Sequence, residues 1–263
     1  TDAVAKSMES MIELDGAQLI FATSFGYFDP FVIETAKKYP DVQFRHAANL
    51  WKEGKDPSNA GGYFCYLNQA HHVDGVAGGL STKSNKIGFV AAKPIPTVLS
   101  NINSVLLGAR KTNPNATVQV IFTGDWSLPV KEAEATNSLV DQGVDVITCH
   151  VDGPKVVVET AEKRGIMSCG YHASQAKLAP KGYLTGAEWD WSTPYKILVS
   201  AAMEGKPMPN FLRGGLKEGF VKMSPYGPAV TAAAKAAGDA AKAGFMKGDF
   251  AIFKGPLKDN KGN

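Results

Sequence analysis

Aromatic, acidic and imidazole side chains follow several apolar runs of the sequence at the point where each run ends. These residue types suit a flat, hydrogen-bonding molecule, because aromatic faces stack on it while carboxylates and imidazoles pair with its edge. The pattern therefore favours binding of a small planar molecule. The residues selected on this basis are Phe25, Tyr27, Trp126, His150, Asp152, Tyr171, Asp190 and Trp191.

The apolar runs have the length and composition of buried β-strands. The run "LIFAT" (19–23) is followed by Phe25 and Tyr27, and the run "DVITC" (145–149) is followed by His150. In doubly wound sheets, ligands bind at the carboxyl ends of the strands. We therefore expect the selected side chains to gather at such ends.

Each selected residue also has a purely structural interpretation. Phe25 and Tyr27 also fit the closure of a hydrophobic core. Asp152 and Asp190 each precede a predicted helix and suit a helix cap. His150 also fits a buried histidine with no contact to a ligand. These alternatives stay open at the level of the sequence.

The sequence contains no GxSxG, Walker, HExxH or strand-following GxGxxG motif, so we predict a protein that is not an enzyme and needs no cofactor. The main alternative is a hydrolase with Asp190 or Asp152 as base and His150 as acid. A ligand-sensing regulatory module is a third hypothesis. His71 and His72 are adjacent and point in different directions on a helix, so no metal site is predicted.

Length and composition indicate an ordinary globular protein. The chain has 263 residues, 44% hydrophobic residues and a formal charge of only +3, with no basic stripe. Nucleic-acid binding is therefore not expected. No apolar run approaches the ~20 residues of a membrane helix. The first residues show no signal-peptide pattern, so export cannot be read from them.

The three cysteines, Cys65, Cys149 and Cys169, lack metal-ligand spacing. Cys149 and Cys169 fall near the ends of consecutive predicted strands, so a disulfide is one interpretation. We favour two buried thiols.

Strand-like runs alternate with helical patterns, which is typical of parallel α/β sheets. The expected strands are 17–23, 42–47, 61–67, 86–92, 117–123, 145–150, 166–171, 182–187 and 249–259. The expected helices are 4–12, 31–38, a small-residue helix that ends near 78–79, 96–109, 130–142, 155–164, 194–203 and 229–243.

Several segments in order resemble the basic membrane protein family, the substrate-binding lipoproteins of ABC importers that include purine nucleoside receptors. The segments that carry this resemblance are "FATSFGYFDPFVIETAKKYPDVQF" (21–44), "KSNKIGFV" (83–90) and "GGLKEG" (214–219). The resemblance implies a type I periplasmic-binding-protein-like fold, in which two doubly wound parallel-sheet lobes flank a hinge and an interlobe cleft. Lobe one would comprise 1–82 and 213–263, and lobe two 83–212.

The resemblance further implies an N-terminal βαβ segment, with ligand contacts of its own, that this sequence lacks. This sequence departs from the family at Gln69, within "FCYLNQAHHVDG" (64–75), where relatives often have an acid, so no contact with the edge of a ligand ring is carried over to this stretch. A monomeric receptor is implied, which lies outside the cytoplasmic membrane, binds a purine base or nucleoside, closes on it by a hinge motion and docks to an ABC permease.

Overall fold

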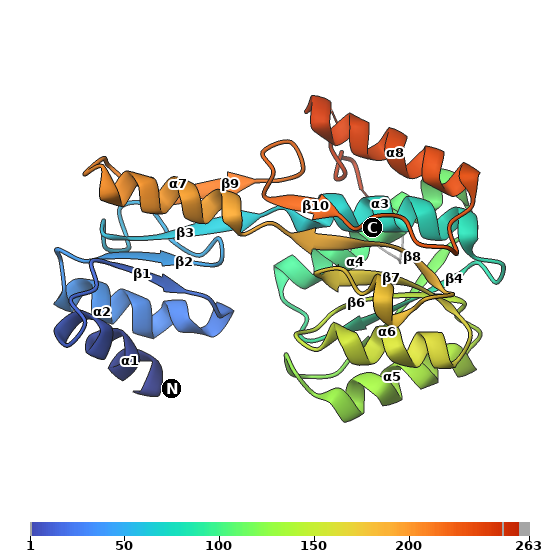
Figure 1. Cartoon of the computed structure of the whole chain (residues 1–263), viewed down its shortest axis with the longest axis horizontal. Helices are drawn as coiled ribbons and strands as arrows, with labels where there is room; N and C mark the ends of the chain where they lie inside the picture. The colour runs from blue at the N-terminus through green and yellow to red at the C-terminus, as the bar shows by residue number, and fades with distance from the viewer. Residues whose placement is uncertain (1, 249, 258–263) are drawn as a thin grey trace. The chain divides into compact units, whose positions relative to one another are not determined.

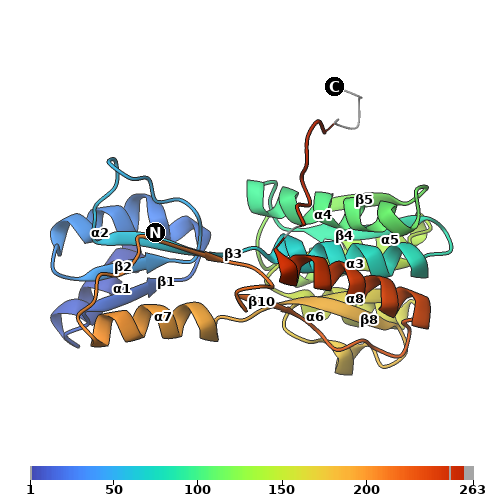
Figure 2. The same ribbon diagram turned by 90° about the horizontal axis from the view of Figure 1, so that it is seen from above.

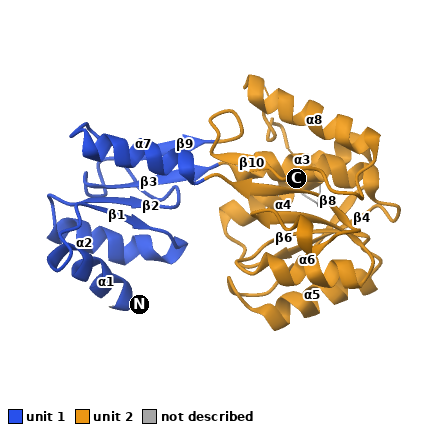
Figure 3. Ribbon diagram, in the orientation of Figure 1, with its two compact units in different colours: residues 1–65, 191–214 blue, residues 66–190, 215–263 orange. Residues whose placement is uncertain are grey.

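The computed structural model describes residues 2–248 and 250–257. The contacts within the chain define two compact units (Figure 3), which comprise residues 1–65 with 191–214 and residues 66–190 with 215–263. We call them unit 1 and unit 2. The chain passes from one unit to the other after residues 65, 190 and 214.

Unit 1 is built on a four-stranded sheet in the order β1-β2-β3-β9, in which all neighbouring strands are parallel. Its strands are β1 (Leu19–Ala22), β2 (Gln43–His46), β3 (Ala60–Cys65) and β9 (Phe211–Gly214). Its helices are α1 (Asp2–Glu13), α2 (Ile33–Lys38) and α7 (Ser192–Met203). Figure 1 shows α7 on one face of this sheet and α1 and α2 on the other.

The core of unit 1 lies between the sheet and helices α1 and α2. Met8 of α1 packs there with Phe28, which belongs to a π-helical turn, Phe28–Val32. Ile20, Ala22 and Phe44 supply the side chains of the sheet. Alternate residues of β1, Ile20 and Ala22, point to this core, as expected for a strand whose successive side chains face opposite sides of the sheet.

Unit 2 contains a six-stranded sheet in the order β10-β8-β7-β6-β4-β5, parallel except for β10. Its strands are β4 (Lys86–Ala91), β5 (Thr117–Phe122), β6 (Val146–His150), β7 (Met167–His172), β8 (Tyr183–Trp189) and β10 (Val221–Met223). Both faces of this sheet are covered, so β6 is buried over its whole length, as expected for a central parallel strand.

Five helices cover the sheet of unit 2 (Figure 1): α3 (Leu67–Ser81), α4 (Pro96–Thr112), α5 (Pro129–Asp141), α6 (Pro154–Lys163) and α8 (Ala232–Lys247). Helices α4, α5 and α6 each have proline in the first turn, where its fixed φ suits a helix start. Helix α8 begins at the cap residue Thr231, whose hydroxyl accepts a hydrogen bond from the backbone N–H of Ala234. It runs alongside α3 (Figure 2).

The boundaries of the units differ from the expected lobes. Helix α3 and residues 215–263 belong to unit 2, and residues 191–212 belong to unit 1. The reason is packing. Glycines of α3 allow it to lie directly against α4, and β10 pairs with β8, which fixes the C-terminal segment to the sheet of unit 2.

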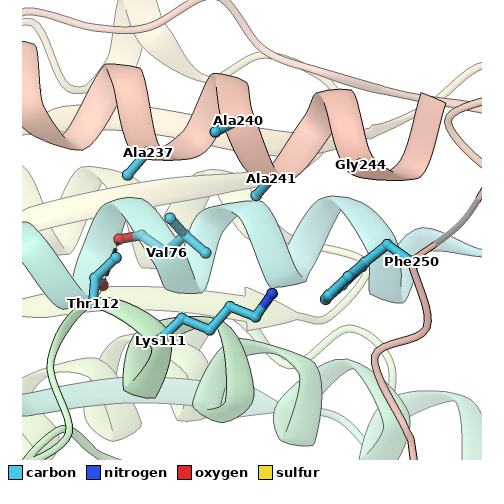
Figure 4. Close-up of a pocket in the computed structure, with 8 residues that line it drawn as sticks. All are labelled: Val76, Lys111, Thr112, Ala237, Ala240, Ala241, Gly244 and Phe250. Atoms are coloured by element: carbon cyan, nitrogen blue, oxygen red, sulfur yellow. Dashed lines mark hydrogen bonds between the residues drawn. The ribbon is translucent and has the colours of Figure 1, made fainter. Parts of the chain in front are cut away.

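The strand predicted at 249–259 is wrong for the residues that the structure describes, because 250–257 contain no strand; 249, 258 and 259 lie outside the described residues. Phe250, the first described residue of this segment, contacts helices instead. Phe250 packs against Phe245 of α8, and Lys111 of α4 lies 3.8 Å above the ring of Phe250 (Figure 4). Among the described residues, no helix is long and apolar enough to cross a membrane.

Candidate ligand-binding site

In unit 2, the side chains that follow the parallel strands meet at one end of the sheet. Trp126 lies in the loop after β5, which turns at Gly124 with φ of 95°. The backbone carbonyl of Trp126 accepts a 2.7 Å hydrogen bond from the backbone N–H of Asp152, in the loop after β6. The two loops are thereby fixed to each other.

A lysine that sequence reasoning did not select lies beside this tryptophan. Lys93, just after β4, pairs with Asp125 at 2.8 Å, and its ammonium lies 6.0 Å from the centre of the Trp126 ring. Hydrogen bonding to this ammonium lowers the pKa of Asp125.

Tyr171, near the end of β7, lies at the centre of a cluster of rings that also contains His150, His172 and Trp126. Its ring centre lies 4.7 Å from that of His150 and 4.1 Å from that of His172. Trp126 adds a fourth ring, 6.1 Å from His150. Tyr171 is only 1% exposed, so in this structure the neighbouring rings separate it from solvent.

His150 is a neutral group in this environment. Burial lowers its pKa well below the usual value, and the proximity of the His71 and His172 side chains acts in the same direction. Its Nδ1 lies 2.8 Å from the side-chain nitrogen of Asn101, on the buried face of α4. Because an amide nitrogen can only donate, Nδ1 is the acceptor.

His172 is held by a second fixed contact. The indole N–H of Trp189, at the end of β8, donates to His172 Nδ1 at 2.9 Å. The other ring nitrogen, Nε2, lies 3.8 Å from a carboxylate oxygen of Asp152. The Asp152 carboxylate therefore lies near this histidine. It does not cap helix α6, whose cap residue is Gly153.

Asp190, the last residue of unit 2 before the chain passes to unit 1, has Lys222 of β10 beside it, with 3.6 Å between ammonium and carboxylate. Lys222 also lies 4.0 Å from Glu188. Glu188 in turn accepts from the hydroxyl of Ser224. The carboxylates at the end of β8 are thus bound into a polar network with β10.

In unit 1, Phe25 and Tyr27 form a short 3-10 helix directly after β1. Both are partly buried, and Tyr27 packs against the core of the unit. Tyr27 also lines a groove of about 430 Å³ between α1 and β1, which has the volume of a small-molecule pocket.

Trp191 belongs to an aromatic cluster on the opposite face of that sheet, beneath α7. Its ring stacks at 21° on Tyr195 and meets Tyr63 edge-on at 5.6 Å. The hydroxyls of Tyr63 and Tyr195 lie 3.0 Å apart, and Phe21 of β1 completes the group, 4.8 Å from Tyr195.

The structure thus brings the predicted residues Trp126, His150, Asp152 and Tyr171 together in unit 2. It places Phe25, Tyr27 and Trp191 in unit 1, on different faces of its sheet. Sequence reasoning missed Lys93, Asn101 and Trp189, and did not select His172. A signal existed for Lys93, Trp189 and His172, which also follow strands; none existed for Asn101, which reaches the cluster from inside a helix.

Two further features stand apart from the strand ends. Gln69 of α3 accepts a 2.8 Å hydrogen bond from the backbone N–H of Leu216 and thereby holds the following loop. An apolar groove of about 320 Å³ lies between α3, α4 and α8, where Lys111 and Thr112 are its polar side chains (Figure 4). No group of three or more potential metal ligands occurs within the described part of the chain.

Parallel α/β units with rings and polar groups at the strand ends define a ligand-binding class of protein. A solute-binding protein of an ABC transporter system from Conexibacter woesei superimposes with a TM-score of 0.73 at 21% identity, over 95% of this chain and 85% of that one. This similarity confirms the predicted type I periplasmic-binding-protein-like fold.

The family follows from sequence comparison. The Bmp family model, described as ABC transporter substrate-binding protein PnrA-like, matches residues 2–239. A purine-binding protein of Brucella abortus is 36% identical over 94% of this chain and 69% of its own length. A putative ABC transporter glucose-binding protein of Haloferax volcanii is 35% identical over 88% of this chain, which spans 59% of that relative. The chain belongs to the Bmp family of substrate-binding proteins, as its resemblance to basic membrane proteins implied.

Proposed function

We propose that this chain is the ligand-capturing part of an ABC importer, that it binds a purine base or nucleoside and that it passes the ligand to a membrane permease. The observation that carries the proposal is the ring cluster of unit 2, in which Trp126, His150 and His172 stand beside the carboxylate of Asp152. The similarity to the purine-binding protein of Brucella supports the choice of ligand.

The chemistry of the cluster suits a nucleobase. An exposed aromatic face gains roughly 1–3 kcal/mol by stacking on a base. Imidazole N–H groups donate to ring nitrogens or carbonyl oxygens, and a carboxylate accepts from ring or amino N–H groups. Since an unpaired polar group in a closed site is costly, these few side chains would determine specificity.

Binding would be coupled to transport by a change of conformation. A ligand that binds the closed form more tightly than the open form shifts the equilibrium between them, and the closed form would engage the permease. The protein would act outside the cytoplasmic membrane as a monomer. The family consists of substrate-binding proteins, so the hydrolase alternative has no support from the comparisons.

A sugar is the second candidate, because the Haloferax relative is named as a glucose-binding protein. Sugars also stack on tryptophan and hydrogen-bond to carboxylates, so Trp126 and Asp152 fit either ligand. The group of four rings, Trp126, His150, Tyr171 and His172, favours a flat heteroaromatic ligand.

Calorimetric titration of the purified protein with adenine, hypoxanthine, their nucleosides and glucose distinguishes the candidates. A purine at a hundred times its dissociation constant should stabilise the fold by about 2.7 kcal/mol and raise the melting temperature. Native mass spectrometry of the protein before titration would identify a ligand retained through purification. Binding of glucose with no binding of any purine would refute the proposal.

A further inference from the structure

Two residues that were not among the predicted site residues, Trp189 and Asn101, fix the orientation of the two histidines at the strand ends of unit 2. His172 receives the indole N–H of Trp189, and His150 receives the amide N–H of Asn101. Both contacts are made to Nδ1, at 2.9 Å and 2.8 Å. In both histidines, therefore, Nδ1 accepts a hydrogen bond from a neighbouring N–H group, which belongs to β8 in one case and to α4 in the other.

The Trp189 contact determines which nitrogen of His172 carries the proton. An indole nitrogen is a donor only, so His172 Nδ1 must present a lone pair. A neutral imidazole has one N–H, which must then be on Nε2. The His172–Asp152 pair is therefore an imidazole N–H whose nitrogen lies 3.8 Å from a carboxylate oxygen, which is too far for a direct hydrogen bond.

The backbone supports the same orientation. His172 has φ of 72°, and among the described residues only Asn85 is a second non-glycine residue with positive φ. This left-handed conformation is unfavourable for most side chains and persists where the surroundings impose it, often at functional sites. Here it turns the imidazole at the end of β7 so that one ring nitrogen meets Trp189 and the other faces Asp152.

For His150, the argument rests on Asn101. Asn101 is 1% exposed within α4, and its amide nitrogen lies at the His150 Nδ1 atom. A buried amide that donates to Nδ1 again leaves the imidazole proton on Nε2. The ring of His150 is packed between Trp126 and Tyr171, so it cannot rotate freely to exchange its two nitrogens.

We infer that Trp189 and Asn101 are positioning residues, which hold the imidazoles of His172 and His150 as neutral Nε2–H donors. Through these two imidazoles, unit 2 recognises hydrogen-bond acceptors on the ligand. The inference rests on the proposed function. The ligand class is a heteroaromatic ring with acceptor nitrogens or a carbonyl oxygen on its edge, next to an N–H for Asp152. Purine bases have such an edge.

Long-range proton–nitrogen NMR of the imidazoles tests the first half without any ligand. In the wild-type protein, His150 and His172 should both show the Nε2–H tautomer. An Nδ1–H form or an imidazolium at neutral pH for either residue would overturn the inference, whatever the protein binds.

Asn101→Asp is the sharpest variant, because it keeps the shape of the side chain and reverses the hydrogen bond. A carboxylate at this position accepts from Nδ1–H, which leaves a lone pair on Nε2, at the ligand side of His150. We expect purine affinity to fall by about 10-fold or more. Asn103→Asp, on the exposed side of the same helix, adds the same charge without touching the cluster and should bind as the wild type does.

Trp189→Phe keeps an aromatic ring but removes the indole N–H. His172 should then populate both tautomers, and affinity should fall by about 5-fold. Trp51→Phe is the matched control, since Trp51 donates its indole N–H to the Pro57 carbonyl within unit 1.

Deaza analogues of adenine and hypoxanthine, in which one ring nitrogen at a time is replaced by C–H, connect the imidazoles to the ligand. At least one analogue should bind the wild type about 10-fold more weakly than its parent base, and this difference should shrink in Asn101→Asp or Trp189→Phe. Equal losses in all proteins would show that the variants act only on structure and would refute the inference. Failure of every purine to bind the wild type would instead refute the proposed function.

Discussion

The α-carbon of Gly75 faces the backbone carbonyl of Val105 so closely that a Cβ atom built on it would lie 2.1 Å from the carbonyl oxygen. The relationship is reciprocal, because a Cβ on Gly108 of α4 would lie 2.1 Å from the carbonyl oxygen of His72 in α3. Backbone therefore packs on backbone where the two helices cross. This contact makes α3 an integral part of unit 2.

Gly75→Ala should destabilise unit 2 by about 2–3 kcal/mol, because the added methyl group can be accommodated only by separating the helices. Chemical denaturation would measure the change. Gly26→Ala is the control, since nothing lies within 4 Å of a Cβ at that exposed position. An unchanged midpoint for Gly75→Ala would show that the helices do not meet in this way.

Arg45 connects β2 of unit 1 to the segment that precedes β9. Its guanidinium donates to the carbonyls of Pro209 and Met208 and also to those of Phe44 and Asn59, at 2.8–3.2 Å. Arg45→Lys should cost about 3 kcal/mol of unfolding free energy, because an ammonium cannot reach these acceptors together and leaves buried carbonyls unpaired.

The control for this prediction is Arg110→Lys. Arg110 is exposed and donates to one carbonyl, that of Ala116, so the change should be within about 0.5 kcal/mol. Equal destabilisation by the two substitutions would contradict the role of Arg45.

Cys65, Cys149 and Cys169 are free and buried, so the interpretation of the sequence as thiols without a disulfide is confirmed. Burial raises the pKa of the Cys149 and Cys169 thiols well above the usual value. We expect no alkylation of the native protein at pH 8, and alkylation of all three thiols after denaturation. Mass spectrometry distinguishes the outcomes, and rapid labelling of native Cys149 would contradict the structure.

Most of the fold could be predicted because each strand and helix has its own periodicity. The run before Trp126 and the run before His150 end within one residue of the ends of β5 and β6. The C-terminal segment was mispredicted, because an apolar run such as that around Phe253 has the same composition whether it extends a sheet or packs on helices. Only tertiary contacts decide between these outcomes.

The candidate site could be predicted in part for a related reason. Side chains that follow strands, such as Asp152, are found by position alone. Asn101 reaches His150 from the middle of a helix, and nothing in the local sequence reveals which buried polar residue faces which strand. The burial of Tyr171 likewise depends on neighbours that are far away in the chain.

His72 should make the protein sensitive to acid. Burial lowers its pKa from 6.5 to about 4. Between these values the unfolded chain binds a proton that the folded chain does not, so stability falls as the pH decreases from 6.5 to 4, by roughly 3 kcal/mol at most. The lowered pKa of His46 and of His150 acts in the same direction, and the raised pKa of Asp74 opposes it.

The His72 contribution can be isolated with His72→Gln, which removes the titrating group and keeps a polar side chain. Denaturation at several pH values should show a shallower loss of stability in the variant between pH 6.5 and 4 than in the wild type. Parallel curves for the two proteins would mean that His72 does not remain neutral in the fold.

Trp126 provides the test of the ring cluster as a binding surface. It is partly exposed, its loop is fixed through the backbone N–H of Asp152, and its ring stands 6.1 Å from that of His150. If a purine stacks on this ring, Trp126→Ala should lower affinity by about 10- to 100-fold, which corresponds to the free energy of stacking one base on an aromatic side chain. Trp126→Phe retains an aromatic face and should lose much less. Calorimetric titration measures both, and an alanine variant that binds purines as tightly as the wild type would place the ligand elsewhere.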